Sequence, residues 1–185
     1  MTGISDDPYW WHAAPPQDLQ IDNWPERADV VIIGGGYTGF GAAIPLVRAG
    51  LDVVILERNQ IGSGASTRNG GITSGNLRLS FDDLTKKFGA EKAIAFYQEA
   101  KAARADLAQF ITSEKIDCDL QQCGRLVGAL RPESLDSMKR DAERLTKLLD
   151  IEATVYDRAS LPDYIDTSRY CGGMMRDDIG GIHPA

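Results

Sequence analysis

Three glycines at positions 34, 36 and 39 and an acidic residue, Glu57, have types and spacing that could bind an anion and a sugar. In a GxGxxG turn, Gly34 permits the tight bend, Gly36 leaves room for a diphosphate, and Gly39 lets the following helix approach the sheet. The first backbone N–H groups of that helix, at Tyr37 and Thr38, would face the phosphates together with the positive end of the helix dipole. The pattern therefore predicts a dinucleotide held by backbone groups, without a lysine.

The residue pair Glu57 and Arg58 bears on which dinucleotide is bound. A carboxylate about 20 residues after the glycines can accept hydrogen bonds from the adenosine ribose. It would repel a ribose 2′-phosphate, which favours FAD or NAD over NADP. Arg58 could pair with such a phosphate, but we interpret it as a solvated neighbour of the site.

Two strands and one helix must position these residues. The run DVVII at 29–33 is almost entirely β-branched, which predicts a parallel strand buried on both faces. A helix over 37–48 follows, with the small residue Ala43 facing the sheet and Gly50 after its end, and a second buried strand is expected over 51–56. This order predicts an α/β fold with a Rossmann-like FAD/NAD(P)-binding domain and a parallel sheet.

A second glycine-rich segment, GSGASTRNGG at 62–71, follows directly after this unit. It is either a flexible surface loop or a second backbone surface that lies against a cofactor. Its position beyond Glu57 favours the second interpretation, because a flavin dinucleotide is long and needs more contact than one helix tip offers. An NAD-dependent dehydrogenase would more usually continue into a plain helix and strand, and it remains the alternative.

The remaining chain predicts two amphipathic helices and several short strands. One helix over 91–111 would direct one apolar face to a core, and another, over 132–149, can begin at Pro132. Strands are expected over 118–130, bent or paired around Gly124, and over 153–156 and 170–175. The expected core positions are Phe96, Ala100, Ala103, Leu107, Phe110 and Ile111 in the first helix and Leu135, Met138, Ala142, Leu145 and Leu149 in the second.

The N-terminal residues 1–27 predict an extended arm, because prolines disfavour a helix there and aromatic residues such as Trp10 and Trp11 can pin it to the domain surface. The net charge of −7 argues against nucleic acid or an anionic membrane as partner. Neither a secretory signal nor a long apolar span is present, so a cytoplasmic location is expected. Three cysteines and two histidines make a metal site improbable, and we interpret the cysteines as buried free thiols.

In order along the chain, the motifs at 34–57, 62–71 and GGIHP at 180–184 resemble the FAD-dependent amine and amino-acid oxidoreductases of the D-amino-acid oxidase superfamily, most closely the γ-glutamylputrescine oxidoreductase type. The resemblance implies that Gly34, Gly36, Gly39 and Glu57 hold the ADP portion of FAD. It implies that the loop lines the diphosphate and runs toward the flavin ring. The loop residues in question are Gly64, Ala65, Ser66, Arg68, Asn69, Gly70 and Gly71.

The same resemblance implies removal of hydride from the carbon next to an amine nitrogen onto the flavin, giving an imine that water hydrolyses. Some relatives attach FAD through a histidine in the loop, whereas Asn69 stands there in this chain, so non-covalent binding is expected. No catalytic residue is assigned, and a structural role is preferred for His183 over a catalytic one. The substrate would be a small amine or amino acid.

Members of this superfamily are considerably longer, so the chain is expected to be an N-terminal portion whose own activity is doubtful. The expected organisation is an arm at 1–27, a βαβ unit with the flavin loop at 28–80, and the truncated start of an α+β substrate domain at 81–185. Two rivals to a flavin oxidoreductase stay open: an NAD-dependent dehydrogenase domain and a non-catalytic nucleotide-binding remnant.

Overall fold

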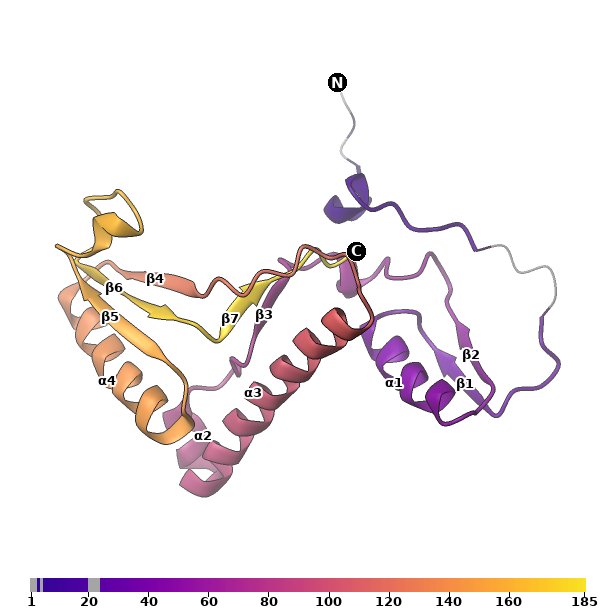
Figure 1. Cartoon of the computed structure of the whole chain (residues 1–185), viewed down its shortest axis with the longest axis horizontal. Coiled ribbons are helices and arrows are strands. Elements are labelled where there is room, and N and C mark those ends of the chain that lie inside the picture. Colours follow the sequence, from indigo (N-terminus) through magenta and orange to yellow (C-terminus); the bar gives the residue numbers. More distant parts are fainter. Residues whose placement is uncertain (1–2, 4, 20–23) are drawn as a thin grey trace. The chain divides into compact units, whose positions relative to one another are not determined.

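The computed structural model describes residues 3, 5–19 and 24–185 (Figure 1). It divides into unit 1, Met1–Gly71 with His183–Ala185, and unit 2, Ile72–Ile182. The sequence placed a boundary after residue 80, but strand β3, Ile72–Ser74, pairs antiparallel with β7, Ile179–Gly181, and so belongs to the second unit. The parts of the expected arm at 1–2, 4 and 20–23 lie outside the described residues.

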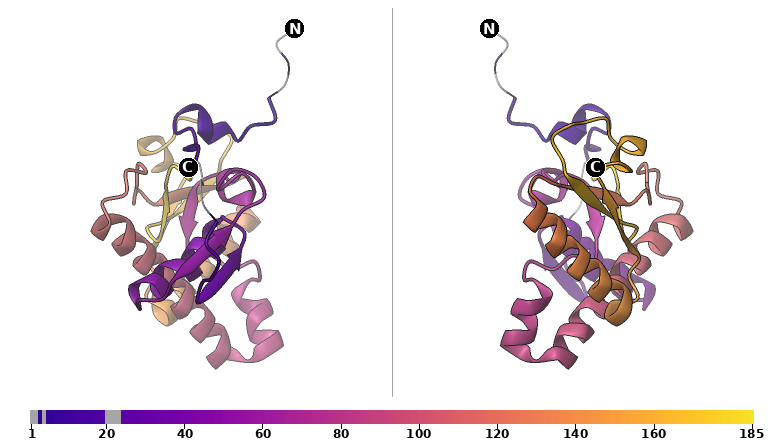
Figure 2. Two further views of the ribbon diagram at one scale, coloured as in Figure 1. Left: turned by 90° about the vertical axis from the view of Figure 1, so that its right-hand side faces the viewer. Right: turned by 90° about the vertical axis from the view of Figure 1, so that its left-hand side faces the viewer.

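Unit 1 contains a strand, helix and strand in the expected order. Strand β1, Val30–Ile33, pairs parallel with β2, Val53–Leu56, and helix α1, Tyr37–Arg48, connects them and lies across them (Figures 1 and 2). The predicted helix bounds are confirmed. After the end of α1, the chain turns at Gly50, whose φ of 85° lies in the left-handed region that favours glycine.

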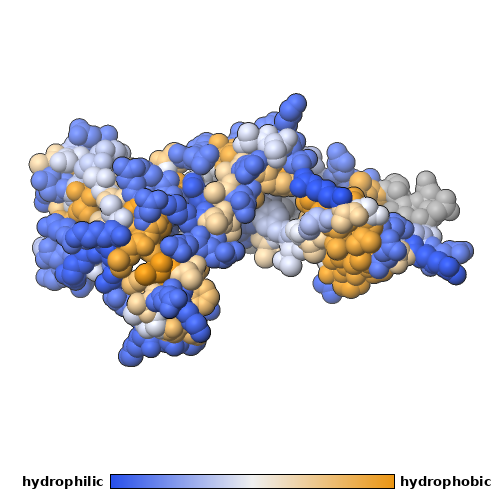
Figure 3. All heavy atoms as spheres, turned by 60° about the horizontal axis from the view of Figure 1, so that its bottom comes forward, coloured by the Kyte–Doolittle hydropathy of each residue, from blue (hydrophilic) through white to orange (hydrophobic). Residues whose placement is uncertain are grey.

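Small residues let α1 lie close to the sheet. Gly39 and Ala43 are the buried residues of α1, and a Cβ on Gly39 would lie only 3.5 Å from Cγ2 of Ile32. Other apolar side chains of α1, such as Val47, are exposed, and Figure 3 shows hydrophobic residues gathered on one surface of unit 1. Helix α1 therefore contacts the sheet through its smallest residues.

The expectation that strand β1 is buried on both faces is wrong for the described residues. Val30 and Ile32 are half-buried beneath α1, but Val31 and Ile33 are 53% and 79% exposed. An unbroken apolar run predicts two covering layers. Among the described residues, α1 covers one face of β1, the other face of β1 is left exposed at Val31 and Ile33, and all four residues of β2 are half-buried.

The N-terminal arm contains one element that the sequence did not predict. Residues Tyr9–His12 form a short 3₁₀ helix, η1, after the buried Pro8. Proline is compatible with a position just before a helical turn, because the helix needs no N–H donor there. Residues 15–19 continue without regular structure, as expected for an extended segment.

Unit 2 is built on a three-stranded antiparallel sheet in the order β4, β6, β5. The strands are Arg125–Ala129, Gly172–Arg176 and Ala153–Asp157, and helix α4, Pro132–Leu149, packs against the sheet. Helices α2, Phe81–Phe88, and α3, Ala90–Ser113, pack on each other. Two further 3₁₀ turns are η2, Ala65–Thr67 in unit 1, and η3, Leu161–Asp163 in unit 2.

The apolar face predicted for α4 is confirmed, whereas that predicted for α3 is confirmed at Ile111 and wrong at Phe96, Ala103 and Leu107. In α4, Pro132 is the first helical residue, and Ala142, Leu145 and Leu149 are buried. In α3, the buried residues are Ala93, Tyr97 and Ile111, while Phe96 is 43% exposed and packs its ring against Phe88. Ala103 and Leu107 are also exposed. The buried face includes Tyr97 because it closes a core with Leu84, Leu145 and Leu149, which a pattern within one helix does not reveal.

The cysteines differ in their surroundings. Cys118 is buried and Cys171 half-buried, but Cys123 is exposed, so the interpretation as buried thiols is wrong for Cys123. Burial raises the pKa of the Cys118 thiol, with Asp117 and Asp119 adding to the effect. Among the described residues, none of the helices is long and apolar enough to cross a membrane.

Candidate dinucleotide site

The glycine turn brings the C-terminal end of β1 to the start of α1. Gly34 has φ 106°, in the region that favours glycine, and its N–H donates to the carbonyl of Leu56 at 2.8 Å. A Cβ on Gly39 would lie 2.0 Å from the carbonyl oxygen of Gly34, so no other residue fits here without displacing backbone. The turn is therefore shaped by the absence of two side chains.

The start of α1 presents N–H groups that the helix itself cannot bond. The first helical bond runs from the Phe40 N–H to the Gly36 carbonyl at 3.1 Å, so the N–H groups of Tyr37, Thr38 and Gly39 precede it. That of Tyr37 donates to the hydroxyl of Ser66 at 3.0 Å. Gly36 gives no side-chain cap, which leaves this helix end suited to an anion.

Glu57 supports the glycine turn from the neighbouring strand. Its Oε2 accepts the Gly35 N–H at 2.7 Å, and its Oε1 accepts the Asn59 N–H at 2.9 Å. The hydrogen bond from the Asn59 N–H, and then that from the Gly35 N–H, lower the pKa of Glu57 below its ordinary value. Partial burial raises this pKa, and the positive charge of Arg58 lowers it. A carboxylate has about four acceptor positions, so it can still accept a sugar hydroxyl.

We expect Glu57→Gln to weaken FAD binding by on the order of tenfold, because an amide cannot accept both backbone N–H groups and a sugar hydroxyl together. The exposed Glu26→Gln serves as the control in the same unit. Fluorescence titration with FAD measures both, and equal affinity in the Glu57 variant and the parent would remove Glu57 from the site.

The same variant has an expected pH signature. Because the folded pKa of Glu57 is lowered, its hydrogen bonds stabilise the fold above the ordinary pKa of 4.5, and this stabilisation is lost as the pH falls through the folded value. Thermal melting of the FAD-free protein across acidic pH should therefore show a smaller acid-induced loss in Glu57→Gln than in the parent.

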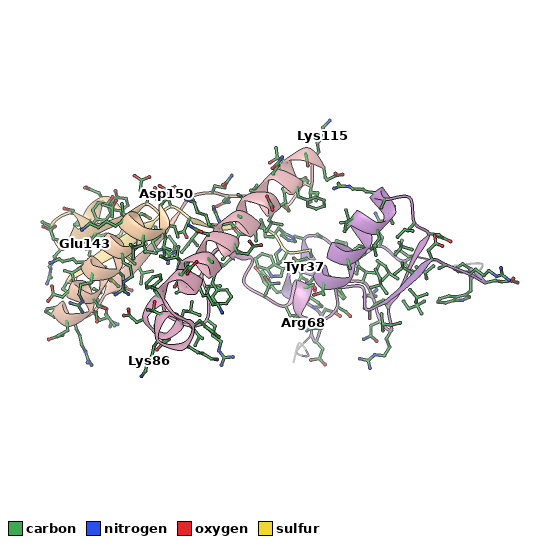
Figure 4. All side chains as sticks on the ribbon, turned by 90° about the horizontal axis from the view of Figure 1, so that it is seen from below. Tyr37, Arg68, Lys86, Lys115, Glu143 and Asp150 are labelled. Carbon is green, nitrogen blue, oxygen red and sulfur yellow. The ribbon has the colours of Figure 1, made fainter. Side chains whose placement is uncertain are left out.

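The loop at 62–71 is held firmly onto the glycine turn, which favours a built surface over a flexible loop. The Gly62 N–H donates to the Gly35 carbonyl at 3.0 Å, and the buried Thr67 hydroxyl donates to the Gly62 carbonyl at 2.6 Å. Ser66 accepts from Tyr37, as described above. Figure 4 marks Tyr37 at the start of α1 and Arg68 in the loop.

Asn69 and Arg68 fold the loop through their side chains. The Asn69 amide donates to the carbonyls of Ala65 and Ser66 at 3.1 and 2.7 Å and accepts the Gly71 N–H at 2.7 Å. Arg68 donates from Nε to the Ser63 carbonyl at 2.8 Å. Gly64 and Gly70 are exposed, as is Arg58. Cofactor contact by these residues remains a prediction.

A cavity of about 390 Å³ opens at this turn, within unit 1. Gly35, Gly36 and Phe40 line it from the α1 side, and Gly62, Ser66 and Thr67 line it from the loop. Tyr37 and Pro184 also line it, and the Tyr37 hydroxyl donates to the Pro184 carbonyl at 2.7 Å. Of the predicted site residues, Gly36, Tyr37 and Ser66 thus line one cavity, whereas Gly34 and Gly39 shape the turn beside it and Glu57 bonds to the Gly35 N–H.

The prediction that aromatic residues pin the arm to the domain surface is confirmed for Trp10, but the sequence did not predict that the arm lines the cavity. The indole N–H of Trp10 donates to the Asn69 carbonyl at 2.8 Å, and the Trp10 ring meets the His183 ring edge to face at 5.0 Å between centroids. His183 Nδ1 lies 2.9 Å from the Ala185 carbonyl oxygen, and these contacts support the structural reading of this histidine. The aromatic composition of the arm was the available signal, but it did not specify a partner.

Comparison with known proteins gives a consistent result. Residues 29–185 match the sequence profile of the FAD dependent oxidoreductase family. The chain is 31% identical over 156 residues to the γ-glutamylputrescine oxidoreductase of Escherichia coli K12, covering 84% of this chain and 36% of that protein. It is 31% identical over 182 residues to the probable oxidoreductase OrdL of Rhizobium meliloti, covering 95% and 41%.

Solved structures share the fold. Glycine oxidase from Geobacillus kaustophilus superposes with a TM-score of 0.68 at 21% identity, covering 86% of this chain and 42% of that one. L-amino acid deaminase from Proteus vulgaris gives 0.65 at 22% identity, covering 91% and 37%. The chain thus spans about two fifths of the length of these relatives.

Proposed function

Because this chain belongs to the FAD dependent oxidoreductase family, we propose that the protein of which it is part oxidises a carbon–nitrogen bond of an amine or amino acid. The named substrates of its relatives, γ-glutamylputrescine and glycine among them, support this class. The product would be an imine that water hydrolyses.

One observation carries the proposal: the glycine turn, the start of α1 and the glycine-rich loop are joined into a single hollow of the right chemistry. A Cβ on Gly36 would lie 2.8 Å from the hydroxyl oxygen of Ser66, so the missing side chain lets this hydroxyl approach the start of α1, where it accepts the Tyr37 N–H. Helix N–H groups, a serine hydroxyl and a nearby carboxylate are the donors and acceptors that a diphosphate and a ribose require. The residues present therefore fit FAD.

Each part of the site has a proposed task. The backbone of Gly36, Tyr37 and Thr38 binds the diphosphate, Glu57 accepts a ribose hydroxyl, and the loop from Gly64 to Gly71 extends the contact. Bound FAD supplies the hydride acceptor. The protein groups orient it and exclude water, so no side chain of this chain is needed as a nucleophile.

The FAD is expected to be bound non-covalently. Asn69 is an amide whose side chain is already occupied by the Ala65, Ser66 and Gly71 backbone groups. Acid precipitation of the purified protein should therefore leave all of the flavin absorbance in the supernatant. Colour that stays in the precipitate would show a covalent bond.

The reaction is tested with the full-length protein under anaerobic conditions. Addition of the substrate amine, from a panel of amines and amino acids, should bleach the flavin absorption band, and an equivalent of aldehyde or keto acid should follow. A protein that binds FAD but is bleached by none of the panel would support the non-catalytic reading instead. A colourless protein that binds NAD would contradict the FAD site.

A further inference from the structure

The N-terminal arm forms one wall of the cavity at the glycine turn. Trp11, Pro15 and Pro16 line it from the arm, facing a lining that includes Gly36, Phe40 and Ser66. All of these residues belong to unit 1. The arm is therefore part of the hollow rather than a segment beside it.

The arm is fastened to this place by Trp10. Its indole N–H donates to the carbonyl of Asn69 at 2.8 Å, and its ring packs on His183 with an interplanar angle of 73°. Pro8, just before η1, is among the most deeply buried residues described. Asn69 is itself bonded across the loop that carries Ser66. One hydrogen bond thus links the arm to the same loop that contacts the start of α1.

We infer that the arm is the outer wall of the FAD site, with Trp10 as the positioning residue that holds it closed and Trp11 as a direct wall residue. This inference rests on the proposed function. An apolar wall next to a helix end excludes water and strengthens the attraction between the N–H groups and the diphosphate. Pro15 and Pro16 restrict the backbone of the wall, so less entropy is lost when it closes.

The consequence concerns release of the cofactor. FAD seated beneath the arm leaves only after the Trp10 bond to Asn69 and the contact with His183 are broken. The arm should therefore slow dissociation of FAD, and changes in it should act on the release rate more than on the association rate.

The test compares three variants of the full-length protein loaded with FAD. Trp10→Phe removes the indole donor but keeps an aromatic ring, and Trp11→Ala removes the wall while leaving the Trp10 bond in place. Trp24→Phe is the matched control, because Trp24 is 66% exposed and does not line the cavity. Flavin fluorescence after dilution reports the release rate, and circular dichroism and melting of the FAD-free proteins report the fold.

We expect release to be about fivefold faster in Trp10→Phe and on the order of tenfold faster in Trp11→Ala, with no change in Trp24→Phe. If Trp10→Phe disturbs the fold, Trp11→Ala decides the question alone. Parent-like release from Trp11→Ala would overturn the inference and leave the FAD site intact. A parent that retains no FAD would instead overturn the proposed function, and the inference with it.

Discussion

Gly39→Ala is expected to destabilise the protein by about 3 kcal/mol and to abolish retention of FAD. The added Cβ would lie 2.0 Å from the Gly34 carbonyl oxygen and 3.5 Å from Ile32. The first contact is with backbone, so it cannot be relieved by rotating a side chain. Helix α1 must move away from β1, and the N–H groups at its start move with it.

Urea unfolding of the FAD-free protein and FAD titration measure the two effects of Gly39→Ala separately. Gly41→Ala is the matched control in the same helix, because a Cβ at Gly41 meets nothing within 4 Å. That control should stabilise the fold by about 0.5–1 kcal/mol, since alanine is the better helix former. A Gly39 variant with the stability of the parent would show that α1 does not approach β1 as described.

Gly36→Val is expected to leave the fold intact and to weaken FAD binding about a hundredfold or more. Its backbone, at φ −100°, is accessible to any residue, and the nearest atom to an added Cβ is the Ser66 hydroxyl oxygen at 2.8 Å. Rotation of Ser66 relieves this contact at the cost of its bond from Tyr37, about 1 kcal/mol. The valine methyl groups then occupy the approach to the helix end.

The diagnostic outcome for Gly36→Val is a normal melting temperature without FAD combined with a failed FAD titration. Gly41→Val should bind FAD like the parent and controls for adding a branched residue to this region. Normal FAD binding by the Gly36 variant would place the diphosphate somewhere other than at this turn.

Local pattern was sufficient for unit 1's central motif. The helix over Tyr37–Arg48, the strands on both sides of it and the positions of Gly34 and Gly39 follow from the sequence, because each depends on backbone conformation and near neighbours. The start of α4 at Pro132 and its buried face were predictable for the same reason. The family resemblance was also readable, since its motifs are short and contiguous.

Contacts between distant segments were decided by the tertiary structure alone. Sequence periodicity directed Phe96 to a core, but the packing of α3 with α2 and α4 selected Tyr97 instead. Whether other segments pack on both faces of β1 is not specified by the apolar residues of β1 itself. Ile33 is exposed although isoleucine is a typical core residue. Likewise, the arm's composition did not show that Trp10 bonds to Asn69, 59 residues away in the chain. The sequence by itself determined the glycine turn that suits a dinucleotide, because a turn depends on neighbouring residues. Only the tertiary structure decided which residues line the cavity at that turn, because the lining comes from segments that are far apart in the chain.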